Sequence, residues 1–253
     1  MTEPFSARLK ASTATIHDEV EHTNFMVDLM EGRLDPRAYA LLLKQYTLIY
    51  AALEAKSSEF AEDPIFAPFH DANLFRGERI VRDLQELTGA VEFMGSDADL
   101  PITRSGEAYA RHLGRLDKPE QVIAHHYTRY LGDLSGGQAI GALMGRHYDI
   151  PASALTIWDF TALGKTKPYK DSYRLRLNDI ADTGGNEQTV IDETMTAFEL
   201  NGELLSELTS LSDRHTADRR TSDRPATAGP TAGRPTATRP AASSVSPAVL
   251  GRS

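Results

Sequence analysis

The fold class that the sequence predicts is all-α, with the helices gathered in one domain. Apolar residues recur every three or four positions along most of the chain, no segment alternates apolar and polar residues as a strand does, and no internal repeat is present. Because an amphipathic helix buries one stripe of side chains, several such segments in succession indicate helices packed around a shared core.

The expected helices follow one another from the N-terminus. Residues 5–20 keep an apolar face at helical spacing. The next helix begins at Asp35, a good N-cap residue, with Pro36 at the first helical position. Two further helices are expected to end near Gly89 and before Pro119.

Three more helices complete the predicted domain. A long one covers residues 120–148, a second covers residues 169–181, and a final amphipathic one ends near Leu211. Beyond it the composition changes to Ala, Thr, Pro, Ser and Arg, which cannot bury enough apolar surface to offset the entropy of ordering. We therefore expect a domain at residues 1–211 and a disordered tail at residues 212–253.

Composition restricts the class of protein and the kinds of site. The formal net charge of −9 argues against a general nucleic-acid binder. The absence of cysteine excludes disulfides, zinc–thiolate sites and iron–sulfur clusters, and it fits a reducing compartment. We expect no signal peptide, because residues 1–10 have no apolar core, and no apolar run of the sequence is long enough for a membrane span. We expect a soluble cytoplasmic protein that is a monomer.

The long helix at residues 120–148 carries glycines that a helix normally avoids. Gly132 and Gly136 form one bare stripe, and a second series starts at Gly137 and repeats every four residues. Each glycine costs roughly 0.5–1 kcal/mol relative to alanine, so several need a reason. Either Gly132, Gly136 and Gly137 admit a planar ligand, with Asp133 holding water beside it, or the glycines pack closely against another helix.

Two further groups of side chains suggest a ligand site. Lys10, His17 and Glu21 share one helix face, so His17 could ligate iron while a carboxylate orients its ring. An ordinary surface ion pair explains the same spacing. Lys170 and Arg174 lie one turn apart and could clamp a carboxylate or phosphate, although the spacing alone favours a solvated basic face.

Other chemistry-bearing motifs are missing from the sequence. His125 and His126 are adjacent and point in different directions on a helix, so they form a poor ligand pair, and His112 belongs to no metal-binding spacing. No nucleophile elbow, phosphate loop or dinucleotide fingerprint is present. The chain is therefore expected to have no flavin or nicotinamide site of its own.

The run YTRYLGDLSGGQ at residues 127–138 resembles the signature of the haem oxygenase family. The segments ASTATIHDEVEHTNFM, QYTLIYAALE, YKDSYRLRLN and TAFELNGELL resemble other conserved regions of that family in the same order, over roughly residues 6–211. The continuation AIGALMGRHYDIP resembles its soluble bacterial members. The resemblance implies that haem b lies between a proximal helix and a glycine-rich distal helix.

The resemblance also implies roles on the two faces of the haem. His17 is the proximal iron ligand, with Glu21 beside it, and Gly132 and Gly136 contact the distal face. Asp133 anchors a water network near the iron-bound oxygen.

The remaining implied roles surround that centre. The residues joined to the Asp133 network are Tyr50 and Arg129. The residues that hold the haem propionates are Lys10, Tyr127, Lys170 and Arg174. The residues that line the pocket's outer wall and polar network are Phe198 and Asn201.

The implied activity is oxidation of haem to biliverdin with release of carbon monoxide and ferrous iron. Oxygen and an external electron donor are required, either a ferredoxin with its reductase or a flavin- or NAD(P)H-dependent reductase, and iron acquisition is the expected purpose. Three alternatives stay open. They are a haem carrier on the same fold, a carboxylate-bridged di-iron oxidase on the same scaffold, and an interaction protein acting through its basic tail.

Overall fold

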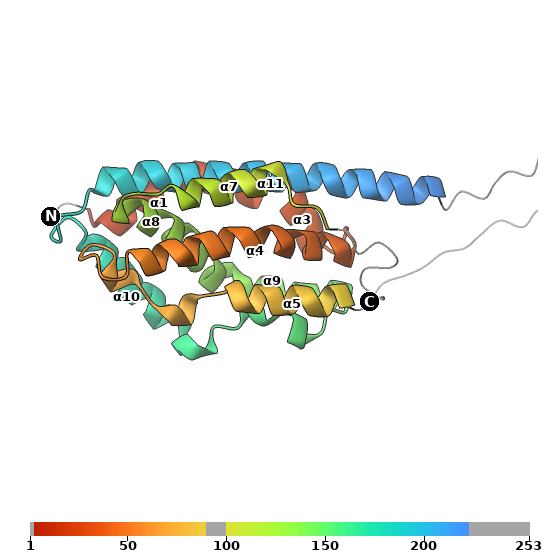
Figure 1. Ribbon diagram of the computed structural model, residues 1–253, viewed down its shortest axis with the longest axis horizontal. Coiled ribbons are helices and arrows are strands. Elements are labelled where there is room, and N and C mark those ends of the chain that lie inside the picture. The colour runs from red at the N-terminus through yellow and green to blue at the C-terminus, as the bar shows by residue number, and fades with distance from the viewer. Residues whose placement is uncertain (1–2, 90–99, 223–253) are drawn as a thin grey trace, which may run out of the picture.

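The computed structural model describes residues 3–89 and 100–222, and for residues 217–222 it describes the backbone only (Figure 1). Within these residues there are helices and no strands, so the predicted all-α class is confirmed. The α-helices, in chain order, are α1 (Phe5–Ser12), α2 (Ala14–Glu21), α3 (Asn24–Met30), α4 (Pro36–Glu59), α5 (Gly77–Gly89), α7 (Arg104–Gly114), α8 (Pro119–His126), α9 (Gly132–Tyr148), α10 (Thr166–Asn178) and α11 (Glu187–Ser222).

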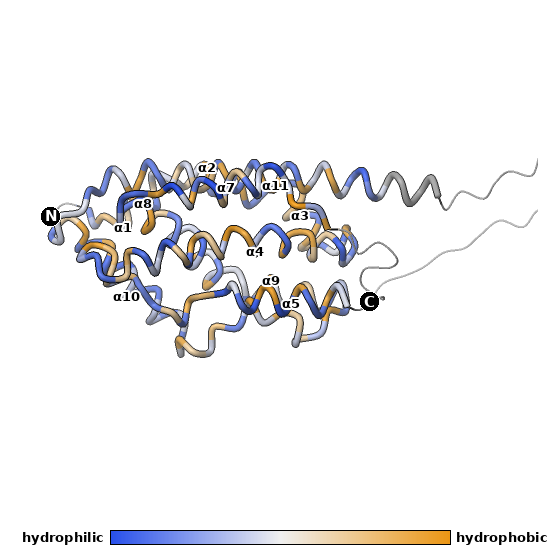
Figure 2. Tube along the Cα trace, in the orientation of Figure 1, coloured by the Kyte–Doolittle hydropathy of each residue, from blue (hydrophilic) through white to orange (hydrophobic). Residues whose placement is uncertain are grey.

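Helix α4 runs through the middle of the molecule. In Figure 1 it lies between α7 and α11 on one side and α5 on the other, and it contacts all three. Its Tyr39, Leu43, Ile49 and Leu53 are fully buried. Figure 2 shows apolar segments of α4 in the interior and polar segments along the outer edge of α11.

The start of α4 has the predicted cap. The Asp35 side chain accepts a hydrogen bond from the Ala38 amide at 3.2 Å, and Pro36 occupies the first helical position. This cap satisfies one of the amides that a helix start leaves without a backbone partner.

The first predicted helix is two helices. It breaks at Thr13, whose hydroxyl donates to the Leu9 carbonyl at 2.9 Å and whose φ and ψ of −104° and 1° are not helical. Lys10 therefore lies on α1, and His17 and Glu21 lie on α2.

The long glycine-bearing helix is also interrupted. Helix α8 leads into a π-helical segment, Tyr127–Leu131, and α9 follows directly. A π-helical segment widens the backbone locally and is often found at functional sites. Asp149 ends α9 in the left-handed conformation with a φ of 53°.

The last helix is longer than predicted. Helix α11 continues to Ser222, past the expected boundary at Leu211, and the ring of His215 lies 3.5 Å from the Asp35 carboxylate. No proline or glycine occurs between residues 212 and 222, so nothing in that stretch stops a helix. Residues 223–253 lie outside the described residues, and for them the disordered tail stays a prediction.

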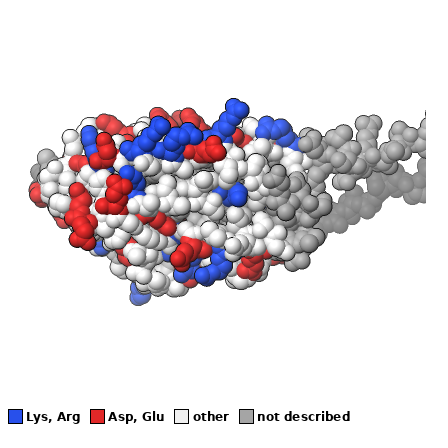
Figure 3. Space-filling model, viewed as in Figure 1, with Lys and Arg blue, Asp and Glu red and all other residues white. Residues whose placement is uncertain are grey.

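The surface carries both signs of charge. Figure 3 shows acidic and basic side chains interspersed on one face of the molecule. None of the described helices is both long enough and apolar enough to cross a bilayer.

Candidate active site

Two adjoining cavities lie where α2, α9 and α11 meet. Their volumes are about 670 and 660 Å³, which is within the range of about 300–1,000 Å³ found for small-molecule sites. The residues common to both linings include His17, Glu21, Gly132, Gly136 and Phe198. We call the two together the cleft.

The α2 side of the cleft presents the predicted iron ligand. The His17 side chain is 48% exposed, and its Nδ1 lies 3.5 Å from the Glu21 carboxylate. Its ring and the Phe198 ring make an edge-to-face contact with their centroids 5.4 Å apart. A carboxylate beside one ring nitrogen is a common way to orient a histidine whose other nitrogen binds a metal.

The glycines of α9 divide into two groups. A Cβ added at Gly132 or Gly136 meets nothing within 4 Å, so both positions are open toward the cleft. A Cβ at Gly137 lies 2.5 Å from Cε3 of Trp158, and one at Gly141 lies 3.0 Å from its Cδ1. Close packing therefore accounts for Gly137 and Gly141, and the alternative in which Gly137 faces a ligand is wrong. For Gly132 and Gly136 a planar ligand stays a prediction.

A buried polar network joins α4, α9 and α11 at the cleft. The Tyr50 hydroxyl donates to the Asp133 carboxylate at 2.5 Å. Arg129 donates from Nε and Nη2 to the Tyr50 oxygen at 3.4 Å, and from Nη1 to Asn201 Oδ1 at 2.9 Å. The guanidinium also lies over the Tyr46 ring, 4.4 Å from its centroid.

The network controls the ionisation of Asp133. Burial raises the pKa of this carboxyl, while the Arg129 charge and the hydrogen bond from Tyr50 act in the opposite direction. Asp133 lines the cleft, whereas Tyr50 is fully buried behind it.

The predicted basic clamp gathers at one end of the cleft. Lys10, Tyr127 and Arg174 line the cavity of about 660 Å³. Lys170 is outside that lining, but its Nζ donates at 3.1 Å to the hydroxyl of Ser135, which belongs to the lining.

Arg174 already has a partner on its own helix. Its Nη1 donates to Asp171 Oδ1 at 2.9 Å, and Asp171 also pairs with Lys167 at 2.7 Å. All three groups are exposed, and exposed ion pairs add little to stability because water screens them. An incoming carboxylate can therefore replace Asp171 at low cost.

The structure adds lining residues that the sequence reasoning passed over. Tyr46 lies against the Arg129 guanidinium and lines the cleft. It precedes Tyr50 by four residues on α4, and this spacing could have identified it as a site residue from the sequence. An apolar end of the cleft is lined by side chains from α3, α9 and α11, including Met26, Met30, Leu143 and Leu205.

The structure also brings together three residues that the sequence left apart. His112, His125 and Glu193, from α7, α8 and α11, form one cluster, although no sequence spacing links them. None of the three lines the cleft, so they supply no second ligand set facing His17.

Comparison with known protein families identifies the family of this chain. The family model described as heme oxygenase matches residues 3–207. The chain belongs to the haem oxygenase family. This haem oxygenase is an enzyme that degrades haem to biliverdin, carbon monoxide and iron.

Individual relatives agree with the family assignment. Heme oxygenase 1 of Homo sapiens is 32% identical over 221 residues, covering 85% of this chain and 75% of the relative. Heme oxygenase 1 of Synechocystis sp. is 26% identical over 210 residues, covering 82% of this chain and 86% of the relative.

Solved structures show the same fold. The crystal structure of heme oxygenase-2 from Synechocystis sp. in complex with heme and NO matches with a TM-score of 0.73 and 26% identity, covering 89% of this chain and 95% of that one. Heme oxygenase-1 from Synechocystis sp. in complex with heme matches with a TM-score of 0.74 and 24% identity, covering 87% and 99%.

Proposed function

We propose that the cleft between α2 and α9 holds the haem, with His17 as the axial ligand and Asp133 as the centre of the distal polar network. The observation that carries the proposal is the pair Gly132 and Gly136. Both are open to the cleft that His17 also lines, so a flat macrocycle can lie against the α9 backbone. Haem then supplies the iron that activates oxygen and the porphyrin carbon that is oxidised.

The proximal roles follow from the contacts on α2 and α11. His17 would bind the iron through Nε2, because Glu21 lies beside its Nδ1. Phe198 supports the imidazole with an edge-on contact, which fixes the tilt of the ring.

The distal role of Asp133 follows from how its carboxylate is held. Tyr50 fixes one carboxylate oxygen at 2.5 Å, and Arg129 fixes Tyr50. The carboxylate therefore has one orientation from which to accept a hydrogen bond from water in the cleft. A water held in that way can donate its other proton toward the site where oxygen reacts, and preorganised donors of this kind stabilise developing charge.

Asn201 extends the same network to α11. Its side-chain oxygen accepts from Arg129 at 2.9 Å, so α11 and the π-helical segment are joined beside the cleft. This bond keeps the guanidinium pointed at Tyr50 and away from solvent.

The basic end of the cleft suits the haem propionates. Lys10 and Arg174 are cations on its lining, Tyr127 adds a hydroxyl, and Lys170 lies next to the lining through Ser135. Charged hydrogen bonds to two carboxylates fix the rotation of the ring in its plane. That rotation would decide which meso carbon reacts, and we propose the α position.

The electrons come from another protein in this proposal. No nucleotide-binding fingerprint occurs in the sequence, so the donor is a ferredoxin with its reductase or a flavin- or NAD(P)H-dependent reductase. We further propose a monomeric, cytoplasmic enzyme that releases iron from haem for the cell's use.

The decisive experiment is an optical titration of the protein with hemin, followed by ascorbate under air with catalase present. A Soret complex that decays to a biliverdin band, with carbon monoxide released, is the expected result. A ferredoxin and reductase pair replaces ascorbate in a parallel reaction to test the donor. A complex that never degrades with either donor contradicts the catalytic proposal.

Two variants assign the roles. Asp133→Ala is expected to bind hemin but to form no biliverdin, since it keeps His17 and loses the distal carboxylate. His17→Ala is expected to change the spectrum of the iron. Normal turnover in the first variant, or an unchanged spectrum in the second, would show that another residue performs the role.

A further inference from the structure

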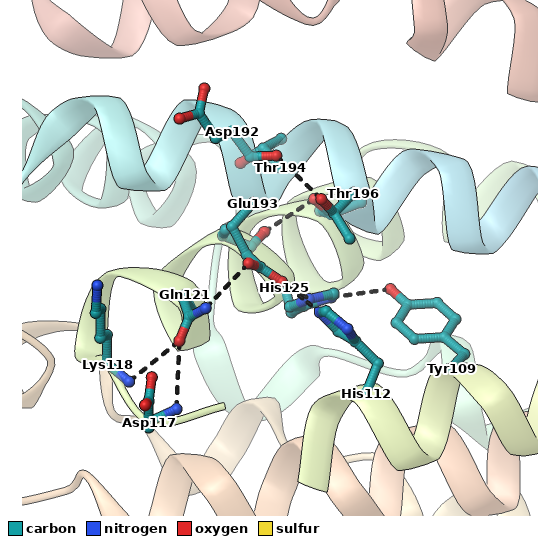
Figure 4. A network of polar contacts seen from close by, with 12 residues as sticks. Tyr109, His112, Asp117, Lys118, Gln121, His125, Asp192, Glu193, Thr194 and Thr196 are labelled. Carbon is teal, nitrogen blue, oxygen red and sulfur yellow. Dashed lines mark hydrogen bonds and ion pairs between the residues drawn. The ribbon is translucent and has the colours of Figure 1, made fainter. Parts of the chain in front are cut away.

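A cluster of two histidines and one glutamate ties three helices together away from the cleft (Figure 4). His112 Nε2 lies 2.5 Å and His125 Nε2 lies 2.9 Å from the same Glu193 oxygen, Oε1. The three side chains come from α7, α8 and α11, so their convergence is a product of the tertiary fold.

The ligand atoms have the chemistry and spacing of a metal site. Two imidazole nitrogens and one carboxylate oxygen lie within 4.8 Å of one another. An ion that binds nitrogen and oxygen at about 2.0–2.2 Å keeps its ligand atoms about 3–3.5 Å apart, so small outward movements of the side chains suffice. Catalytic zinc sites commonly use three protein ligands and leave the fourth position to water.

The residues around the three ligands resemble the outer shell of a metal site. The Tyr109 hydroxyl lies 3.2 Å from His125 Nδ1, and Gln121 Nε2 donates to the second Glu193 oxygen at 3.2 Å (Figure 4). Partners of this kind orient metal-binding histidines and carboxylates. Tyr109 and His125 are completely buried, so their relative positions are set by packing.

Tyr109 lets His125 switch between two hydrogen-bonding states. A carboxylate oxygen can only accept, so without a metal the proton of His125 lies on Nε2 and is donated to Glu193, which leaves Nδ1 to accept from the Tyr109 hydroxyl. With a metal on Nε2, the proton would lie on Nδ1, and Nδ1–H would donate a hydrogen bond to the Tyr109 oxygen. A phenol hydroxyl can serve as donor or acceptor, so Tyr109 suits both states. The neutral histidine changes its tautomer and needs to lose no proton.

The cluster is reachable from solvent on one side. The His112 side chain is 33% exposed, whereas that of His125 is 0% exposed. An ion can therefore enter past His112 and reach the Glu193 carboxylate beside it.

We propose that His112, His125 and Glu193 bind one divalent transition-metal ion of the zinc type, with water at the remaining position. The site is separate from the haem cleft, since none of the three residues lines it. It cross-links α7, α8 and α11, and His125 precedes Arg129 of the distal network by one helical turn. The proposal does not depend on the proposed haem function.

Calorimetric titration of the full haem-free chain with zinc chloride tests the proposal. One equivalent of zinc is expected to bind and to raise the melting temperature. His112→Ala and Glu193→Gln are each expected to remove that equivalent. Tyr109→Phe keeps all three ligands and removes one orienting hydroxyl, so it should weaken binding about 10- to 100-fold.

Control variants separate this site from other histidines. His17→Ala removes the imidazole of the cleft, and His22→Ala removes an exposed histidine that lies beside Asp18. Both are expected to keep the full equivalent of zinc. Circular dichroism of each variant checks that it is folded, and Tyr109→Phe retains a test if His112→Ala or Glu193→Gln fails that check.

Two results would overturn the proposal. One is the absence of zinc binding to the unmodified chain, which leaves the cluster as a hydrogen-bond network only. The other is binding that persists in His112→Ala and Glu193→Gln but disappears in His17→Ala or His22→Ala.

Discussion

Two neighbouring glycines of α9 give the sharpest prediction. Gly136 and Gly137 are adjacent in sequence, yet a methyl group added at Gly136 meets nothing within 4 Å, and one added at Gly137 lies 2.5 Å from the Trp158 ring. Alanine at either position gives the same gain in helix propensity, about 0.8–1.0 kcal/mol. That gain cancels when the two variants are compared, so the comparison isolates packing.

The expected magnitudes follow from these contacts. Gly136→Ala should raise the free energy of unfolding of the haem-free protein by about 1 kcal/mol. Gly137→Ala adds an overpacking cost of about 1–3 kcal/mol, because the Trp158 indole is held at Nε1 by the Tyr39 hydroxyl at 3.0 Å. At about 2–4 °C per kcal/mol, the melting temperatures of the two variants should differ by about 2–12 °C.

Haem binding should show the opposite order. The methyl group of Gly136→Ala projects into the cleft, where the same overpacking cost of about 1–3 kcal/mol lowers hemin affinity about 5- to 150-fold. Gly137→Ala points away from the cleft and should leave the affinity close to that of the parent chain. Urea unfolding of the haem-free proteins and hemin titration measure the two effects separately. Lower stability in Gly136→Ala than in Gly137→Ala, or equal losses of hemin affinity, would refute the division of the glycines into two groups.

Three further predictions concern the polar groups. Tyr50→Phe removes the 2.5 Å bond to the buried Asp133, so the free energy of unfolding measured in urea should fall by about 1.5–3 kcal/mol. Loss of the same bond should raise the pKa of Asp133 further, so the acid limb of the pH profile of turnover should move to higher pH. An unmoved acid limb would mean that Asp133 does not control turnover. Lys170→Ala combined with Arg174→Ala should weaken hemin binding or yield additional biliverdin isomers, and a single unaltered isomer at unaltered affinity would count against the clamp. The free energy of unfolding should also decline in acid. The pKa of Glu193 is held at about 2 instead of 4.5, so its ionised form stabilises the fold above pH 4.5 and this contribution is lost as the pH falls through about 2. Burial lowers the pKa of His125, so protonation of this histidine in the unfolded chain adds to the decline below pH 6.5. Glu193→Gln should flatten the decline between about pH 4.5 and 2 in pH-dependent unfolding measurements, and an unchanged slope would place it in other groups.

Much of the fold could be predicted because helix periodicity and end signals are local. The Asp35–Pro36 start of α4 was readable, since a cap depends on residues three positions apart. The break at Thr13 and the π-helical segment Tyr127–Leu131 could not be predicted, because the residues at both places are equally compatible with a continuous α-helix. The length of α11 was underestimated because composition alone marked residues after Leu211 as a tail.

The sequence by itself determined the chemistry available to this protein. It placed a histidine and a carboxylate one turn apart at His17 and Glu21, and it set Asp133 among bare glycines. These are properties of helix spacing, which fixes which side chains share a face. The run at residues 127–138 also carried the family resemblance, because the order of residues is all that such a signature needs.

Only the tertiary structure decided which groups meet. Gly132 is open to the cleft, whereas Trp158 reaches Gly137 from a separate segment of the chain and packs against it. The bond between Tyr50 and Asp133 joins residues 83 positions apart, and the bond between His125 and Glu193 joins residues 68 apart. Contacts of that kind arise from how whole helices pack against one another, and no local spacing records them.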